Sequence, residues 1–185
     1  MIKFYLNREL SERLGIRLSK WKRWSREFLP PDPLGGLQSG YARQYTIDQA
    51  FTVYLGGHLV AALYFSIPHA KQIVHELGPW IKTHKPAFSG KAPESIFKDT
   101  QVYIFKQVSP SSGEVAFAYL ERIRLSDTPY EKGGPHVRQE VYQEKPIPVA
   151  SSSNGLDTLD TDDKMGSRIL YVSHLYNCFM AGVNS

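Results

Sequence analysis

The sequence predicts an all-α N-terminal domain and a small α+β C-terminal domain. Three observations lead to this fold class: apolar residues recur at helical spacing up to about residue 81, two runs rich in β-branched and aromatic residues follow residue 99, and Lys, Pro, Gly and Ser dominate between them. With 185 residues and 42% hydrophobic content, the chain can bury one sizeable core or two small ones. We expect domains at 1–82 and 99–185, joined by a linker at 83–98.

The first domain begins with two short helices separated by a tight turn. Asn7 is a suitable N-cap, and Leu10 and Leu14 lie four residues apart on one helical face. Gly15 is expected to end this helix, because glycine adopts a left-handed turn at little cost. A second helix is expected at about residues 19–28.

The second helix has an apolar side and a cationic side. Its expected buried stripe recurs at spacings of three and four residues and consists of Leu18, Trp21, Trp24 and Phe28. The other side is polar and strongly basic, with Ser19, Lys20, Lys22, Arg23 and Arg26. Most charged helix faces are only solvated surface, but here no acidic residue balances the cations before Glu27. This helix is therefore a candidate for the major groove of duplex DNA.

The net charge of the protein comes from this first module. Residues 1–45 contain nine Lys and Arg against four Asp and Glu, a net charge of +5. Residues 46–185 contain thirteen against fourteen, a net charge of −1. Basic charge gathered on one small module is typical of phosphate contact, although a basic N-terminus can also serve solubility alone.

A proline-rich segment ends the second helix, and a glycine-rich loop follows it. Pro30 and Pro31 lack backbone donors and restrict the residues before them. The glycine-rich segment at 34–43, which ends at Arg43, indicates a hairpin or wing.

Two longer helices complete the expected domain. Thr46 and Gln49 form a capping box that opens the first of them. The pair Gly56-Gly57 inside this helix costs about 1 kcal/mol per residue relative to alanine, so close packing against another helix is the expected compensation. The next helix opens with Ser66 as its N-cap and is expected to end at Gly78-Pro79.

Six short sequence segments of the first domain occur in the same order as in a known protein family. They are Glu9-Leu10-Ser11, Leu14-Gly15-Ile16, Trp21-Lys22-Arg23-Trp24, Phe28-Leu29-Pro30, Gly40-Tyr41 with Arg43 and Tyr45, and Phe65-Ser66-Ile67. With these segments, residues 5 to about 81 resemble the winged helix-turn-helix DNA-binding domain of the MerR family of bacterial transcription regulators. The resemblance covers a little under half of the chain. It implies a recognition helix at about 19–28 in the major groove and a wing at 34–43 on the DNA backbone.

The charge pattern and the resemblance together give one candidate DNA-binding set. It consists of Arg17, Ser19, Lys20, Lys22, Arg23, Arg26, Tyr41 and Arg43. Two positions depart from the family: Ser19 stands where members often have a DNA-contacting arginine, and Arg23 replaces a phosphate-contacting tyrosine. The resemblance therefore leaves the recognised DNA sequence open.

A homodimer is expected through the C-terminal half. The long dimerisation helix of the family is not expected here, because Gly78-Pro79 and Lys85-Pro86 interrupt the chain where that helix would run. One recognition helix covers few base pairs, so helix-in-groove readers commonly bind as symmetric dimers. The apolar candidates for this contact are Val102–Phe105, Val115–Leu120, Leu175, Phe179 and Met180.

The second domain is expected to contain a β-hairpin followed by a long loop, and to dimerise or sense an effector. Residues 100–108 and 115–123 carry the strand signal and are separated by a Ser-Pro-Ser-Ser-Gly-Glu turn. Residues 126–167 are rich in Gly, Pro, Ser and Asp, and we expect most of them to form a loop that is mobile around 143–167.

The chain closes with an expected short strand at 169–172 and a helix capped by Ser173. That helix carries the single cysteine, Cys178, which is expected to be a buried apolar residue. No Cys/His cluster has zinc-ligand spacing, and no carboxylate pair or phosphate-cradling loop indicates an enzyme. The longest apolar run, Leu59–Phe65, is too short for a membrane span. We expect a cytoplasmic protein that is not an enzyme and has no cofactor or metal.

The expected function is that of a sequence-specific transcriptional regulator that binds double-stranded DNA as a homodimer, with RNA polymerase as a further partner. A DNA-architectural or excisionase-like recombination accessory factor is the alternative, because excisionases use the same winged-helix plan but are usually much shorter. A protein-interaction module that no longer binds DNA is the third reading, and it would not need a cationic second helix. The sequence does not give the operator, the effector or the direction of regulation.

Overall fold

The structure is a computed structural model, and it describes residues 3–32, 42–88, 99–109, 111–128, 139–149 and 166–185. The chain divides into two compact units. The first unit is Met1–Gly78 with Tyr176–Ser185, and the second unit is Pro79–Leu175. Two helices, α4 (Ile67–Phe88) and α5 (Val172–Asn184), contribute residues to both units. No helix in the described ranges is long and apolar enough to cross a membrane.

The fold is α+β, and the expectation of an all-α N-terminal domain followed by a small α+β domain is wrong. The described residues form five helices and two antiparallel sheets, one of two strands and one of four. The two-stranded sheet lies in the first unit, where β1 (Tyr5–Leu6) pairs with β2 (Gln44–Tyr45). Strands of two residues are too short to show the alternation of apolar and polar residues that predicts a strand.

The first unit contains the expected helix, turn and helix. α1 (Asn7–Arg13) and α2 (Leu18–Phe28) are joined by a turn in which Gly15 has a φ of +63°, the left-handed region that favours glycine. The N-cap of α1 is Leu6, one residue before the expected Asn7. Asn7 is instead the first helical residue, and its side chain has another use in the structure.

The caps of the two following helices agree with the sequence. α3 (Ile47–Ala61) begins with the predicted capping box: Gln49 N–H donates to Thr46 Oγ1 at 3.2 Å, and Thr46 N–H donates to Gln49 Oε1 at 3.0 Å. At the start of α4, His69 N–H donates to Ser66 Oγ at 3.4 Å. These caps fix where both helices begin.

The glycine pair in α3 holds α2, as the sequence predicted. A Cβ atom on Gly56 would lie less than 3.0 Å from the ring of Phe28, and a Cβ atom on Gly57 would lie less than 3.0 Å from the ring of Trp24. Both rings are buried. The aromatic residues of α2 therefore occupy the space that side chains on α3 would otherwise fill.

α4 does not end at Gly78-Pro79, so this prediction is wrong. The helix continues to Phe88, and residues 83–88 of the expected linker are helical, while residues 89–98 lie outside the described part of the chain. A proline inside a helix removes one backbone hydrogen bond. Leu77 and Ile81, four residues apart and on either side of the proline, are both buried. This continuous apolar face compensates for the lost bond.

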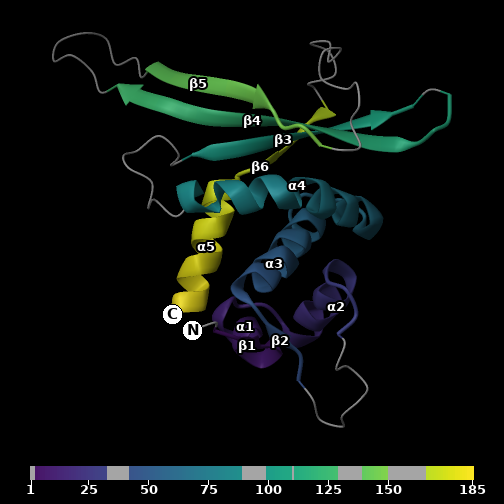
Figure 1. Ribbon diagram of the computed structural model, residues 1–185, viewed down its shortest axis with the longest axis vertical. Coiled ribbons are helices and arrows are strands. Elements are labelled where there is room, and N and C mark those ends of the chain that lie inside the picture. The colour runs from purple at the N-terminus through teal and green to yellow at the C-terminus, as the bar shows by residue number, and fades with distance from the viewer. Residues whose placement is uncertain (1–2, 33–41, 89–98, 110, 129–138, 150–165) are drawn as a thin grey trace. The chain divides into compact units, whose positions relative to one another are not determined.

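The second unit contains a four-stranded sheet in the order β5-β4-β3-β6, with every neighbouring pair antiparallel (Figure 1). β3 (Thr100–Val108) has the predicted bounds, and β4 (Val115–Thr128) starts as predicted but runs five residues further. β6 (Arg168–Leu170) pairs with β3 on its other side. Val102 and Phe105, both in β3, are buried.

β5 (Gln139–Pro146) was not predicted, because residues 126–167 were expected to form mainly a loop. Its residues pair with β4, for example Val141 with Ser126 and Glu144 with Arg122. Most of its side chains are exposed, and it lies at the edge of the sheet. A strand that is polar on both faces lacks the alternating pattern on which sequence prediction depends.

The end of α5 packs against α3 inside the first unit. The ring centroids of Phe179 and Phe51 lie 5.3 Å apart, and Phe179 is fully buried. Arg13 of α1 donates to the carbonyl oxygen of Val183. Phe179 was expected to contribute to a dimer surface, but its side chain packs against Phe51 within the first unit. Cys178, which was expected to be buried, is exposed.

The glycine pair gives a first prediction. Gly57→Ala should destabilise the protein by about 1–3 kcal/mol, because the new methyl group overpacks against the ring of Trp24. The matched control is Gly78→Ala in α4, where an added Cβ meets no atom within 4 Å. That variant should gain up to about 1 kcal/mol from helix propensity. Urea denaturation, monitored by tryptophan fluorescence, measures the free energy of unfolding of both variants. Equal stabilities of the two variants would show that the glycine pair does not hold α2.

Candidate nucleic-acid interface

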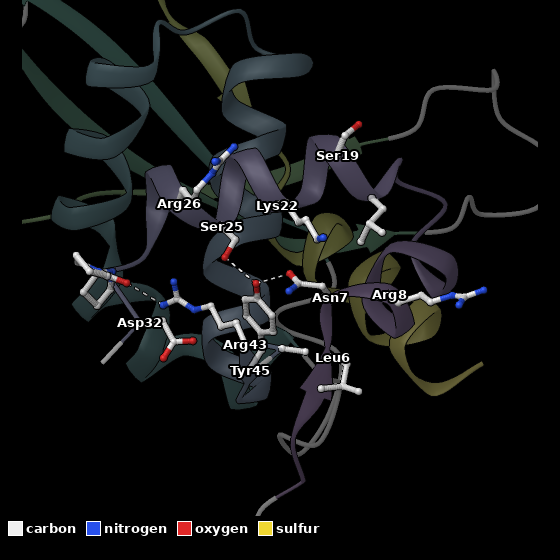
Figure 2. Close-up of a pocket in the computed structure, with 14 residues that line it drawn as sticks. Leu6, Asn7, Arg8, Ser19, Lys22, Ser25, Arg26, Asp32, Arg43 and Tyr45 are labelled. Atoms are coloured by element: carbon white, nitrogen blue, oxygen red, sulfur yellow. Dashed lines mark hydrogen bonds between the residues drawn. The ribbon is translucent and has the colours of Figure 1, made fainter. Parts of the chain in front are cut away.

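A pocket of about 970 Å³ opens on the first unit, on the exposed side of α2 (Figure 2). Three segments line it: the start of α1, one face of α2 with the prolines that follow it, and the residues that lead into β2. The lining residues are Leu6, Asn7, Arg8, Leu18, Ser19, Lys22, Ser25, Arg26, Pro30, Pro31, Asp32, Ala42, Arg43 and Tyr45.

The structure divides the eight expected DNA-binding residues. Those that line the pocket are Ser19, Lys22, Arg26 and Arg43. Those that are exposed but do not line it are Arg17, Lys20 and Arg23. Tyr41 lies outside the described residues, as do residues 34–41 of the expected wing.

Helix geometry explains why only some cations of α2 face the pocket. Ser19, Lys22 and Arg26 follow one another at spacings of three and four residues, so they share a face. Lys20 lies on another side, with its Nζ atom 4.8 Å from the ring centroid of Trp24. The expected cationic side is therefore two rows of charge, and one of them borders the pocket.

Arg43 is held against the end of α2. Its Nη2 donates to the carbonyl oxygen of Pro30 at 2.9 Å, and its guanidinium lies 5.7 Å from the ring centroid of Tyr45 (Figure 2). Pro30 lies two residues beyond Phe28, the last residue of α2, so its carbonyl oxygen accepts no hydrogen bond from within the helix. The cation is therefore positioned by the same residues that end the helix.

A buried tyrosine hydroxyl joins the three segments behind the pocket. Ser25 Oγ and Tyr45 Oη lie 2.7 Å apart, and Tyr45 donates to Asn7 Oδ1 at 2.5 Å (Figure 2). The rings of Tyr45 and Trp21 meet edge to face with centroids 5.9 Å apart. Burial raises the pKa of Tyr45 above its ordinary value, and the Ser25 hydrogen bond and the charge of Arg43 oppose that rise. The hydroxyl is therefore protonated at neutral pH and can donate to Asn7.

The charged residues of the lining are mainly cationic. It carries Arg8, Lys22, Arg26 and Arg43 against one carboxylate, Asp32. Arg8 is partly neutralised, because its Nε lies 2.8 Å from Glu12 Oε1. Such a lining can bind a phosphate backbone through charge and through donors that point outward. Within the described ranges no group of three or more His, Cys, Asp or Glu residues is placed to hold a metal ion.

Sequence reasoning missed several lining residues. Leu18 was expected to be buried with Trp21, Trp24 and Phe28, which are buried, but it is 37% exposed. It is the first residue of α2, and it lines the pocket. The uncharged residues before and after the cationic helix carry no signal in the sequence that would place them at the pocket; they are Leu6, Asn7, Pro30, Pro31, Ala42 and Tyr45. Comparison with protein-family models gave no match, and comparison with curated proteins gave none either.

The Tyr45 hydroxyl gives a second prediction. Tyr45→Phe should destabilise the protein by about 1–3 kcal/mol, because it leaves Ser25 and Asn7 without their shared partner. Tyr64→Phe removes the same atom from a residue that is 81% exposed and should change stability by less than about 0.5 kcal/mol. Chemical denaturation at neutral pH compares the two.

The raised pKa of Tyr45 adds a pH dependence with a definite sign. A phenol whose pKa rises on folding stabilises the folded state below the unfolded pKa of about 10, and this stabilisation is lost as the pH rises through the folded pKa. The stability of Tyr45→Phe should therefore fall less steeply above pH 10 than that of the parent. Parallel alkaline declines would mean that Tyr45 titrates as it does in the unfolded chain.

Proposed function

We propose that the first unit binds duplex DNA and that the protein is a sequence-specific transcriptional regulator of the MerR-like winged helix-turn-helix type. The observation that carries this proposal is the row of Ser19, Lys22 and Arg26 on one face of α2, with Arg43 across the same pocket. A short helix, a glycine turn and a cationic second helix are the parts with which helix–turn–helix proteins enter the major groove.

The elements take separate roles in this proposal. α2 lies in the major groove, so that the side chains of its first turns approach base edges. Arg43 contacts a phosphate at the side of the groove, because its guanidinium is held next to the end of α2. Charge brings the protein to DNA, and the shared face of α2 selects the sequence.

A homodimer and RNA polymerase are proposed partners of the full chain. Two copies related by a two-fold axis would place two α2 helices on successive major grooves. The apolar residues first considered for this contact include Phe179, Val102 and Phe105, which are buried. The dimer contact therefore uses other residues of the chain.

Selection from a random duplex library, followed by mapping of bound sites in a bacterial genome, tests the proposed function. A regulator should enrich one sequence motif that lies at promoters. Enrichment at recombination attachment sites would instead favour the excisionase-like accessory factor. A library without any enriched motif would contradict sequence-specific binding.

The two rows of α2 give the third prediction. Lys22→Ala and Arg26→Ala should each weaken binding and reduce the slope of log affinity against log salt by about one unit per lost cationic contact with DNA. Lys20→Ala and Arg23→Ala are the matched controls, because they remove the same charge from the same helix outside the pocket. Anisotropy titrations at several salt concentrations measure all four. Equal losses in the two pairs would show that the pocket face has no special role.

The oligomeric state gives the fourth prediction. Light scattering of the full chain should give a mass near twice the 21.0 kDa of one chain, and the mass on an operator duplex should include two copies. A monomer in both measurements would contradict the proposed dimer. It would leave DNA binding by one copy to be judged from the titrations.

A further inference from the structure

Two apolar side chains lie among the cations of the pocket. Leu18, the first residue of α2, is 37% exposed, and Leu6, the last residue of β1, is 45% exposed. Both line the pocket with Lys22, which follows Leu18 by about one helical turn. A surface that bound only phosphate would need charge and hydrogen-bond donors, and it would have no use for exposed leucines.

Duplex DNA offers a matching apolar group. In the major groove the C5-methyl group of thymine is the apolar feature that distinguishes one base pair from the others. Helix–turn–helix proteins bring the N-terminal residues of the recognition helix to the base edges. Leu18 and Ser19 are the first two residues of α2, so they occupy the positions from which bases are read.

We propose that Leu18, supported by Leu6, contacts the methyl group of one thymine in each half-site. This inference rests on the proposed function and adds to it a specificity-determining residue. Ser19 and Lys22 line the same pocket as Leu18 and supply donors to neighbouring bases, and lysine is suited to the O6 and N7 acceptors of guanine. The read sequence therefore contains a thymine close to a guanine.

Charge complementarity selects DNA as the occupant of this apolar surface. The leucines are bordered by Arg8, Lys22 and Arg26, and Asp32 is the carboxylate among the lining residues. A second copy of this chain would bring like charges together at the same surface, whereas a phosphate backbone brings opposite charge. In duplex DNA the edges of the bases lie between two phosphate backbones. This arrangement best matches a surface on which apolar side chains lie among cations.

The test uses the full chain and the tightest duplex from the library selection. Each thymine of this duplex is replaced by deoxyuridine in turn, which removes the methyl group and keeps the base pairing. One position per half-site should weaken binding by about fourfold, the effect of one buried methyl group. Because the dimer carries two copies of Leu18, Leu18→Ala removes both contacts and should bind the parent duplex about sixteenfold more weakly, with no further loss when deoxyuridine replaces either thymine.

Two variants control for other causes. Val108→Ala trims another exposed apolar residue, 54% exposed in β3, and should keep the full deoxyuridine effect. Lys22→Ala should bind more weakly overall and also keep that effect, because it removes charge and not the apolar contact. Leu18→Ala should melt like the parent, since the side chain is exposed.

The outcomes separate this inference from the proposed function. A deoxyuridine effect of equal size in the parent and in Leu18→Ala would overturn the thymine contact, and so would a tight duplex in which no thymine is sensitive. In both cases DNA binding would stand. A selection that yields no bound duplex would overturn the proposed function and the thymine contact together.

Discussion

The packing of α2 on two glycines of α3 is the constraint on which the candidate site depends. Phe28 and Trp24 occupy the space beside Gly56 and Gly57 where side chains would otherwise stand. Because these rings are large and buried, their position fixes both the depth and the rotation of α2. The rotation decides which residues of the helix face solvent. The charged face is therefore positioned by buried residues on the opposite side of the helix.

The Tyr45 hydroxyl supplies the second constraint, and it acts across the chain. It joins Asn7, Ser25 and the strand β2, three segments that are far apart in sequence. Its hydrogen bonds therefore hold β2 next to both the start of α1 and the middle of α2. Arg43 lies two residues before Tyr45, so the same tie determines where that cation can reach. A side chain on a short strand thus aligns two helices and a charge.

Much of the first unit could be predicted from the sequence because its signals are local. The turn at Gly15, the capping box of Thr46 and the packing of Gly56-Gly57 each follow from a few neighbouring residues. The strands β1 and β2 could not be predicted, since two residues carry no periodicity. That residues 176–185 belong to the first unit could not be predicted either, because it depends on contacts between segments that are distant in sequence.

In the second unit, prediction succeeded where a strand is buried and failed where it is exposed. β3 has the predicted bounds and carries Val102 and Ile104 in its buried positions. β5 forms by pairing its backbone with β4, and its mostly exposed side chains show no apolar alternation. The continuation of α4 past Gly78-Pro79 could not be predicted for a related reason. Local rules count the free-energy cost of a proline inside a helix, whereas the burial of Leu77 and Ile81 compensates for that cost.

The candidate site shows the same limit at the level of single side chains. The sequence places five candidate DNA-binding residues on α2, but it does not say where the rotation of the helix divides them. Lys20 stacks over Trp24, a ring that the glycines of α3 hold in place, so its row turns away from the pocket. Lys22 and Arg26 then share a face with the exposed Leu18. A surface that combines charge with an apolar residue at the start of a helix can distinguish bases, whereas charge alone only attracts the backbone.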